Sequence, residues 1–235
     1  DGITIASAFS PTFPEQFEDV SYGYGFNPSI TAQAHWFAEP TPGATNGPGG
    51  PLILDPGFSP QVPTLADPVV VTATLLGNPV QAGLHTRVLY RTESTLAMTD
   101  DGTGGDAVAG DGIWTGVIPA GTAGMGQMLR WRMEVADGFG NTSLSPPFDD
   151  PNKDPEYHGT MVEDSTWTSS LPALHWFVES PGAAGNPSGT RCSVFWDSIL
   201  YDNLLVRPRG GSSTWWPKKN FKFDFNPGFR LRIDP

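Results

Sequence analysis

The chain contains 235 residues, of which 25 are acidic and 13 are basic, giving a formal net charge of −12 at pH 7. Nucleic acids and anionic membrane surfaces repel an acidic chain of this kind, so neither is an expected partner. The sequence has no run of 18 apolar residues, and we therefore expect no helix to insert into a membrane. The 28 glycines and 24 prolines favour turns over long helices, so we expect an all-β protein.

Residues 1–50 contain a short apolar run over residues 3–9, which predicts a strand, and two motifs rich in small residues. The motifs are Asp19-Val20-Ser21-Tyr22-Gly23 and Pro40-Thr41-Pro42-Gly43-Ala44-Thr45-Asn46-Gly47. As a pair they resemble the C-terminal part of the lamin-tail domain, an immunoglobulin-like domain of bacterial surface proteins. A piece of this length is too short to bury a core of its own. We therefore expect it to pack on the next module, on residues beyond this sequence, or on a neighbouring chain.

Residues 51–150 have the pattern of a complete β-sandwich. Apolar runs separated by glycine, proline, asparagine and aspartate predict strands over residues 69–76, 85–91, 113–118 and 127–136. In the last run, apolar residues alternate with charged ones: Leu129, Trp131, Met133 and Val135 against Arg130, Arg132 and Glu134. This period of two indicates an antiparallel strand that is buried on one face only.

Glycine- and aspartate-rich motifs punctuate the same segment: Met98-Thr99-Asp100-Asp101-Gly102, Gly105-Asp106, Gly110-Asp111-Gly112-Ile113-Trp114-Thr115 and Ala136-Asp137-Gly138-Phe139-Gly140-Asn141-Thr142. These motifs resemble the choice-of-anchor X type of bacterial immunoglobulin-like module. Modules of this type are found beside CotH kinase domains. The resemblance implies an immunoglobulin-like sandwich in an extracellular protein.

Four aspartates, Asp100, Asp101, Asp106 and Asp111, share one glycine-rich loop. Carboxylates at this spacing, with glycines that let carbonyl groups turn inward, offer the oxygen ligands that Ca²⁺ prefers. The loop is not an EF-hand, because no glutamate closes it at the required offset. The alternative is a pair of tight Asp-Gly turns whose aspartates bond their own backbone. The sequence leaves both interpretations open.

Residues 151–170 are rich in proline and aspartate and are expected to form a linker to a third segment, residues 171–235. Near its end this segment reads Arg207-Pro208-Arg209-Gly210-Gly211-Ser212-Ser213 and then Pro217-Lys218-Lys219-Asn220-Phe221. The order resembles the first motif of the CotH kinase family, bacterial protein kinases of the spore-coat type, which reads roughly Arg-x-Arg-Gly-x-Ser-Ser followed by Pro-Lys-Lys-Ser-Phe. Residues 171–178 and 191–197 resemble the opening strands of the same family.

The resemblance implies a set of residues that face nucleotide phosphates: Arg207, Arg209, Ser212, Ser213, Lys218 and Lys219. Two positions depart from the usual pattern or from ordinary strand chemistry. Asn220 replaces the usual serine. Pro208 cannot donate to a sheet ladder, so we expect its strand to be an edge strand or to be bulged. Cys192, the single cysteine, is expected to be a buried small hydrophobe.

Strand parity separates the lysines of this motif. Side chains alternate across a strand, so Lys219 shares the core-facing side with Phe221, Phe223 and Phe225, and Lys222 points the other way. A lysine at the mouth of an apolar face is partly desolvated and favours an anionic partner. In kinases such a lysine holds nucleotide phosphates. The alternative is that these lysines are ordinary solvated residues flanking a hydrophobic strand.

The resemblance places the acidic metal ligands and the catalytic carboxylate of the family downstream of residue 235. We therefore expect a fragment of a secreted or cell-surface bacterial CotH-type kinase, inert on its own, with ATP and Mg²⁺ or Mn²⁺ as cofactors only of a full-length parent. A second hypothesis is a structural or adhesive protein whose β-modules assemble into a fibre or coat through protein partners or self-association. A third, a carbohydrate-binding module, depends only on the eight tryptophans.

Overall fold

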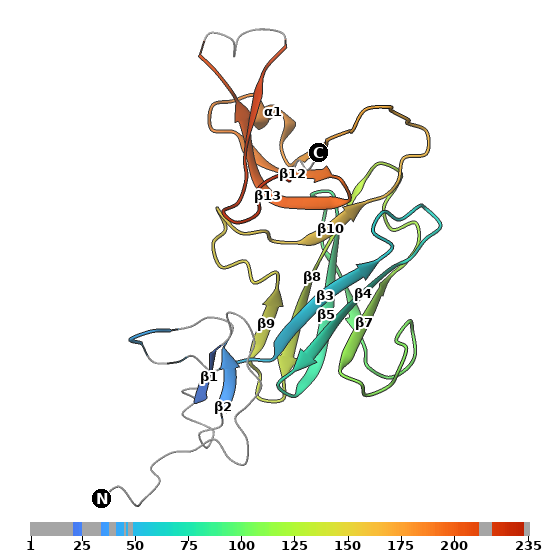
Figure 1. Ribbon diagram of the computed structural model, residues 1–235, viewed down its shortest axis with the longest axis vertical. Helices are drawn as coiled ribbons and strands as arrows, with labels where there is room; N and C mark the ends of the chain where they lie inside the picture. Colours follow the sequence, from blue (N-terminus) through green and yellow to red (C-terminus); the bar gives the residue numbers. More distant parts are fainter. Residues whose placement is uncertain are drawn as a thin grey trace, which may run out of the picture.

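The computed structural model of the chain describes residues 21–24, 34–37, 41–44, 46, 49–211 and 218–232 (Figure 1). Across these ranges nearly every regular element is a β-strand, and helix occurs there only as one short turn, α1 (Pro181–Ala184). The expected all-β fold is confirmed. No helix within the described ranges is long and apolar enough to cross a membrane. The strand expected over residues 3–9 lies outside the described residues.

Two antiparallel sheets face each other in the centre of the molecule (Figure 1). The first has the order β3 (Leu52–Ser59), β4 (Val69–Leu76), β7 (Ile113–Ile118). The second has the order β10 (His158–Met161), β8 (Met128–Asp137), β5 (Pro79–Val88), β6 (Ser94–Met98), and β9 (Thr142–Ser145) also pairs with β8. Strands β1 (Ser21–Tyr24) and β2 (Ala34–Phe37) form a separate pair near the blue end of the chain. The expected sandwich is therefore present.

The core of the sandwich is built from one face of each long strand. Its largest contributions come from β4 and β8: Val69, Val71, Ala73 and Leu75, then Leu129, Trp131, Met133 and Val135. The β8 residues are the four that the alternating pattern predicts to be buried. Trp131 packs edge-on against Phe58 of β3, with ring centroids 4.8 Å apart. Contacts of this kind tie the two sheets together across the core.

The segment 151–170 does more than connect two modules. It contains β10, which pairs antiparallel with β8 and sets His158 opposite Trp131. Thr160 Oγ1 also donates a 2.6 Å hydrogen bond to the carbonyl oxygen of Gln61, and Val162 belongs to the sandwich core. The middle of the expected linker is therefore a strand of the sandwich sheet.

The C-terminal module is a four-stranded antiparallel sheet in the order β11 (His175–Val178), β12 (Thr190–Trp196), β13 (Ile199–Pro208), β14 (Phe221–Asp224). Its buried core includes Cys192, Val194 and Val206. Phe221, Phe223 and Phe225 are half-buried and pack against that core, as their period of two predicts. Burial raises the pKa of the Cys192 thiol to about 12, so the sulfur is a neutral apolar group, as expected.

Pro208 does not make β13 an edge strand. β13 lies between β12 and β14, and the register irregularity of this sheet falls at Cys192 and Val194. Pro208 is instead the last residue of β13, beyond the final pair with β12, where it lies opposite Phe221 of β14 alone. The strand is bulged, as one of the two expectations has it: between the pairs Cys192–Leu204 and Val194–Tyr201, β13 contains one residue more than β12. The bulge lies away from Pro208, whose missing N–H costs nothing at a strand end on the side that has no neighbour.

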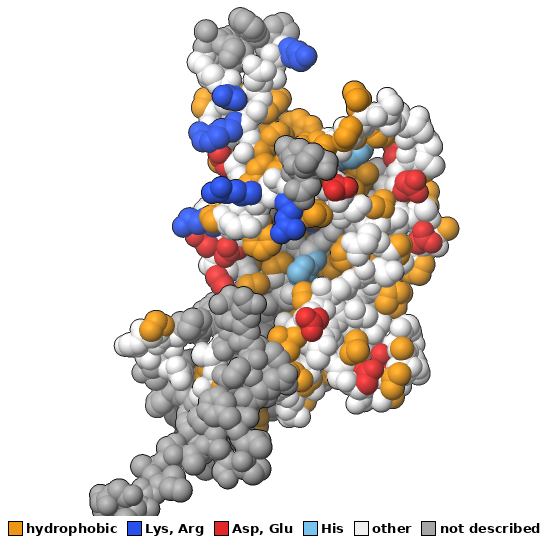
Figure 2. Space-filling model, viewed as in Figure 1, with side chains coloured by type: hydrophobic (Ala, Val, Ile, Leu, Met, Phe, Trp, Pro, Cys, Tyr) orange, Lys and Arg blue, Asp and Glu red, His pale blue; other side chains and the backbone are white. Residues whose placement is uncertain are grey.

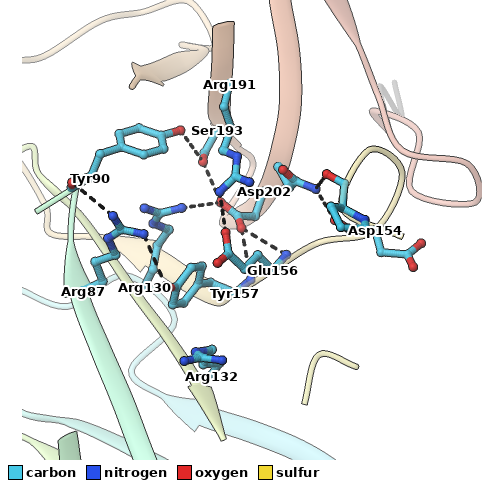
Figure 3. Close-up of polar contacts among 12 residues, drawn as sticks. Arg87, Tyr90, Arg130, Arg132, Asp154, Glu156, Tyr157, Arg191, Ser193 and Asp202 are labelled. Atoms are coloured by element: carbon cyan, nitrogen blue, oxygen red, sulfur yellow. Dashed lines mark hydrogen bonds and ion pairs between the residues drawn. The ribbon is translucent and has the colours of Figure 1, made fainter. Parts of the chain in front are cut away.

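A buried ion pair joins the C-terminal sheet to the sandwich (Figure 3). Arg130 Nη1 of β8 lies 2.9 Å from Asp202 Oδ1 of β13, and the two side chains are 0% and 1% exposed. Asp202 also accepts hydrogen bonds from Ser193 Oγ at 2.7 Å and from the backbone N–H of Tyr157 at 3.0 Å. The expectation that β8 is buried on one face only is therefore wrong at Arg130, because the C-terminal sheet covers that position.

Two tyrosine rings enclose the Arg130 guanidinium. Its Cζ lies 4.4 Å from the ring centroid of Tyr90 and 4.6 Å from that of Tyr157. The Tyr90 hydroxyl shares a 3.0 Å hydrogen bond with Ser193 Oγ on the other side of the junction. We call Tyr90, Arg130, Tyr157, Ser193 and Asp202 the junction cluster. Removing one partner of a buried ion pair is strongly destabilising, so this cluster favours one relative position of the two modules.

Candidate functional site

The C-terminal sheet carries an open pocket of about 820 Å³. Side chains from β11, from β14 and from the segments next to them line it. Lys219, Phe221 and Phe223 line it together, three of the four residues that strand parity assigns to one face. Lys219 is exposed, and its Nζ donates a 3.3 Å hydrogen bond to the carbonyl oxygen of Gly185, just after α1. The pocket therefore presents a solvated ammonium group at the edge of an apolar surface.

Aromatic rings form the apolar part of this pocket. Trp176 of β11 packs against Phe221 with ring centroids 5.2 Å apart and against Phe223 with centroids 5.4 Å apart. Leu174 extends the same surface. Trp176 and Leu174 remain partly open to solvent, so a planar ligand group can reach them. Neither residue was among the predicted site residues, because only the pairing of β11 with β12 brings that strand to the basic motif.

The basic residues of the motif separate in space. Arg209 lines the pocket, and its backbone N–H donates to the carbonyl oxygen of Asn220 at 2.7 Å. Arg207 instead lies opposite Lys222, and its Nε and Nη2 both lie 3.1 Å from Asp224 Oδ2. Lys222 also pairs with Asp224, and these two contacts lower the pKa of the Asp224 carboxyl, that of Lys222 more strongly. Arg207 is therefore engaged on the other face.

The other predicted phosphate-facing residues of the motif are Lys218, Ser212 and Ser213. Lys218 is exposed and does not line the pocket. Ser212 and Ser213 lie outside the described residues. Of the phosphate-facing set implied by the resemblance, the structure thus brings together Arg209 and Lys219, with Gly210 between them on the pocket wall.

Basic residues are concentrated toward the end of the C-terminal module, and two of them line this pocket. Seven of the 13 basic residues of the chain fall between residues 207 and 232: Arg207, Arg209, Lys218, Lys219, Lys222, Arg230 and Arg232. Figure 2 shows Lys and Arg side chains only toward the end of the molecule that carries β12 and β13, whereas acidic side chains are spread over the whole face. An otherwise acidic protein thus has a local surface that attracts anions.

The aspartate loop brings three of its four predicted residues together. Asp100, Asp106 and Asp111 each place a carboxylate oxygen within 4.8 Å of the others. Asp101 is not part of this group, because its Oδ1 accepts hydrogen bonds from the backbone N–H and the hydroxyl of Thr103 at 2.9 and 2.8 Å. Those two bonds lower the pKa of Asp101. The predicted set of four is thus a triad and a separate turn.

The same triad also stabilises the loop backbone. Asp100 accepts hydrogen bonds from the backbone N–H groups of Gly110, Asp111 and Gly112, at 2.7, 3.2 and 3.0 Å. Asp106 is buried and accepts from the N–H of Gly102 at 2.6 Å. Both predicted roles, turn formation and a grouping of oxygen ligands, are compatible with this geometry.

Comparison of the chain with models of known protein families finds no match, and a search of curated proteins finds no similar sequence.

Proposed function

We propose that this chain is part of a secreted or cell-surface bacterial protein kinase of the CotH type, and that its pocket on β11 and β14 contacts the phosphate groups of a nucleotide. The position of Lys219 carries the proposal. Its ammonium group lies at the rim of an aromatic pocket whose described lining residues include no carboxylate. Lysine binds phosphate as a point charge, and aromatic faces such as that of Trp176 stack on nucleobases.

The same geometry supports the expectation that the chain alone transfers no phosphate. Phosphoryl transfer needs carboxylates that hold divalent metal and orient the attacking hydroxyl. The described wall of the pocket offers Arg209, Lys219, Gly210 and Asn220 as its polar residues. The nearest acidic residue of the hairpin, Asp224, is paired with Arg207 and Lys222 on the other face. Nucleotide binding and phosphoryl transfer are thus separable properties here.

Lys219→Ala is expected to weaken nucleotide binding by about tenfold or more, because a hydrogen bond to a charged group contributes about 1.5–3 kcal/mol. The measurement is a fluorescence titration with ADP labelled on its ribose. Lys222→Ala is the matched control, since it removes the same charge from the same hairpin, and it should change the affinity less than about twofold because its Nζ pairs with Asp224.

Equal losses from the two lysine variants would mean that only the overall charge matters, and the assigned pocket would then be incorrect. Incorporation of radioactive phosphate from ATP into any protein by the purified chain would contradict the expected lack of transfer. Absence of nucleotide binding by the unmodified chain at millimolar concentration would count against the proposal as a whole.

A structural or adhesive role is the second candidate, and exposed apolar side chains favour it. Trp167, Leu171, Leu174 and Trp176 lie in or just before β11 and are each more than a third exposed. β11 is also an edge strand of its sheet. An apolar edge strand can pair with another chain. If this role dominates, sedimentation should show concentration-dependent assembly of the pure protein, and Leu171→Lys should reduce it.

We also propose that Ca²⁺ binds among Asp100, Asp106 and Asp111 and stabilises the sandwich. Calcium sites in extracellular modules have dissociation constants of about 0.1–1 mM, so 5 mM Ca²⁺ should add about 1–2 kcal/mol to the free energy of unfolding. A stabilisation of that size raises the melting temperature of a protein of this length by about 3–6 °C. Calorimetric melting with Ca²⁺ and with chelator measures the effect.

Two aspartate variants separate this calcium site from plain turns. Asp106→Asn should abolish the calcium-dependent rise in melting temperature, because Asp106 belongs to the triad. Asp101→Asn should keep the rise, since Asp101 only caps its own turn at Thr103. If neither calcium nor chelator changes the melting temperature, the loop is only a pair of turns.

A further inference from the structure

A second cavity lies where the C-terminal sheet meets the sandwich, and it is distinct from the basic pocket. Its volume is about 580 Å³, within the range of about 300–1,000 Å³ that small-molecule sites occupy. The sandwich contributes Phe58 of β3 and the chain from β9 to β10, and the C-terminal module contributes the start of β13. Figure 1 shows β10 and β13 running side by side at this junction. The junction cluster holds these walls in place.

Aromatic rings from four separate segments line the cavity: Phe58, Tyr157, Tyr201 and Phe229. The Tyr157 ring is fixed in position, because its hydroxyl donates a 2.6 Å hydrogen bond to Glu93. Tyr201 is held by an edge contact with Phe225, at 5.5 Å between ring centroids, and its hydroxyl accepts the N–H of Arg232. At least these two rings are therefore fixed before any ligand arrives. Preformed aromatic walls favour ligands with an apolar body.

The charge of the cavity is negative. Asp149, Asp154 and Asp202 line it, and no lysine or arginine does so among the residues that the structure describes. Asp202 is paired with Arg130, and Asp154 adds a lining carboxylate whose Oδ2 accepts a hydrogen bond from the backbone N–H of Asp150. His158 adds no positive charge at pH 7, because burial lowers its pKa to about 4. The neutral imidazole Nε2 shares a 3.0 Å hydrogen bond with Ser145 Oγ.

We propose that this cavity binds a small organic ammonium compound with an apolar or aromatic body. Aromatic faces attract cations through their quadrupole, and the rings of Phe58, Tyr201 and Phe229 offer such faces, whereas Tyr157 already packs on Arg130. A nearby carboxylate adds a direct electrostatic attraction. An anionic ligand would be repelled by the Asp154 carboxylate. A neutral apolar ligand would use the rings but leave the charge of the cavity unused. This inference stands on the junction cavity alone and does not depend on the function proposed for the basic pocket.

The test compares two probes of nearly equal shape, 2-phenylethylammonium and 2-phenylethanol, by nuclear magnetic resonance titration of the whole chain at pH 7. The ammonium compound should bind about tenfold more tightly than the alcohol, since the attraction of the cation to rings and carboxylates adds to the shared apolar contact. Phenylacetate should bind more weakly than either. Shifted amide signals should cluster at residues 157–159 and 198–204.

Ile199→Trp should block the mouth of the cavity and reduce binding of both amine and alcohol more than tenfold. Ile199 lines the cavity and is 41% exposed, so a larger side chain there does not overpack the core. Ile113→Trp is the matched control, because Ile113 is 42% exposed on β7 and lies away from the cavity. The control should bind both probes as the unmodified chain does.

Asp154→Asn should weaken binding of the ammonium probe about fivefold and leave binding of the alcohol unchanged. The substitution keeps an oxygen that can accept the 2.8 Å hydrogen bond from the N–H of Asp150. Asp164→Asn, which alters a comparable turn at Thr166, should change neither affinity. The proposal is overturned if amine and alcohol bind equally, if phenylacetate binds best, if a lysine-containing peptide binds far better than the amine, or if Ile199→Trp changes nothing.

Discussion

Asp202→Ala is expected to lower the free energy of unfolding by about 3–5 kcal/mol, the usual cost of leaving one member of a buried ion pair without its partner. Arg130 is fully buried and already has one nitrogen, Nε, without a hydrogen-bond partner. Removing Asp202 also takes away the carboxylate that accepts hydrogen bonds from the Ser193 hydroxyl and from the backbone N–H of Tyr157. Equilibrium unfolding in urea, followed by tryptophan fluorescence, measures the loss.

Two further variants show whether the loss comes from the buried charge. Asp224→Ala breaks exposed ion pairs in the same sheet and should cost less than about 1 kcal/mol. The double variant Arg130→Met/Asp202→Leu removes both charges and should be more stable than Asp202→Ala alone. A double variant no more stable than the single one would mean that the hydrogen bonds of Asp202, and not the stranded charge of Arg130, account for the loss.

Gly159→Ala is expected to cost about 2–3 kcal/mol, because it adds a methyl group where β10 meets both β8 and β13. A Cβ at this position would lie 2.6 Å from the carbonyl oxygen of Leu129 and 2.5 Å from Leu200 Cδ2. The carbonyl belongs to a strand that is paired on both sides, so it cannot move away easily. Thermal and urea unfolding measure the change.

Gly182→Ala is the matched control for this substitution. A Cβ at Gly182 in α1 would meet nothing within 4 Å, and alanine is the better helix former, so stability should be unchanged or slightly higher. Adding Leu200→Ala to Gly159→Ala relieves one of the two close contacts. If that second change restored full stability, the contact with the Leu129 carbonyl would be unimportant, contrary to the expected result.

The strands that sequence reasoning located correctly are those with a strong local pattern. The runs at residues 69–76 and 113–118 coincide with β4 and β7 because each is a continuous apolar, β-branched segment between glycines and aspartates. For β5 the pattern predicts residues 85–91, whereas the strand spans Pro79–Val88, because the first half of the strand lacks a continuous apolar run. β10 was not predicted, because His158-Gly159-Thr160-Met161 becomes a strand only by pairing with β8.

The limits of prediction at the site have a similar origin. Alternation along β14 could place Lys219 beside Phe221, since that relation is local. It could not show that Arg207 would pair with Asp224 across the hairpin, because the register of two strands depends on the whole sheet. No local sequence pattern predicts the junction cavity, because its aromatic rings come from residues as far apart in the sequence as Phe58 and Phe229.

The enclosed guanidinium of Arg130 also determines how this protein can be recombined with others. A module copied from residue 171 onward would carry Asp202 without Arg130, Tyr90 and Tyr157, and would therefore expose a surface around this carboxylate that is buried in the whole protein. A sandwich copied alone would expose the guanidinium and the tyrosine rings around it. The sandwich and the C-terminal sheet should therefore be gained or lost in gene rearrangements as a single unit, even though they contain two separate hydrophobic cores.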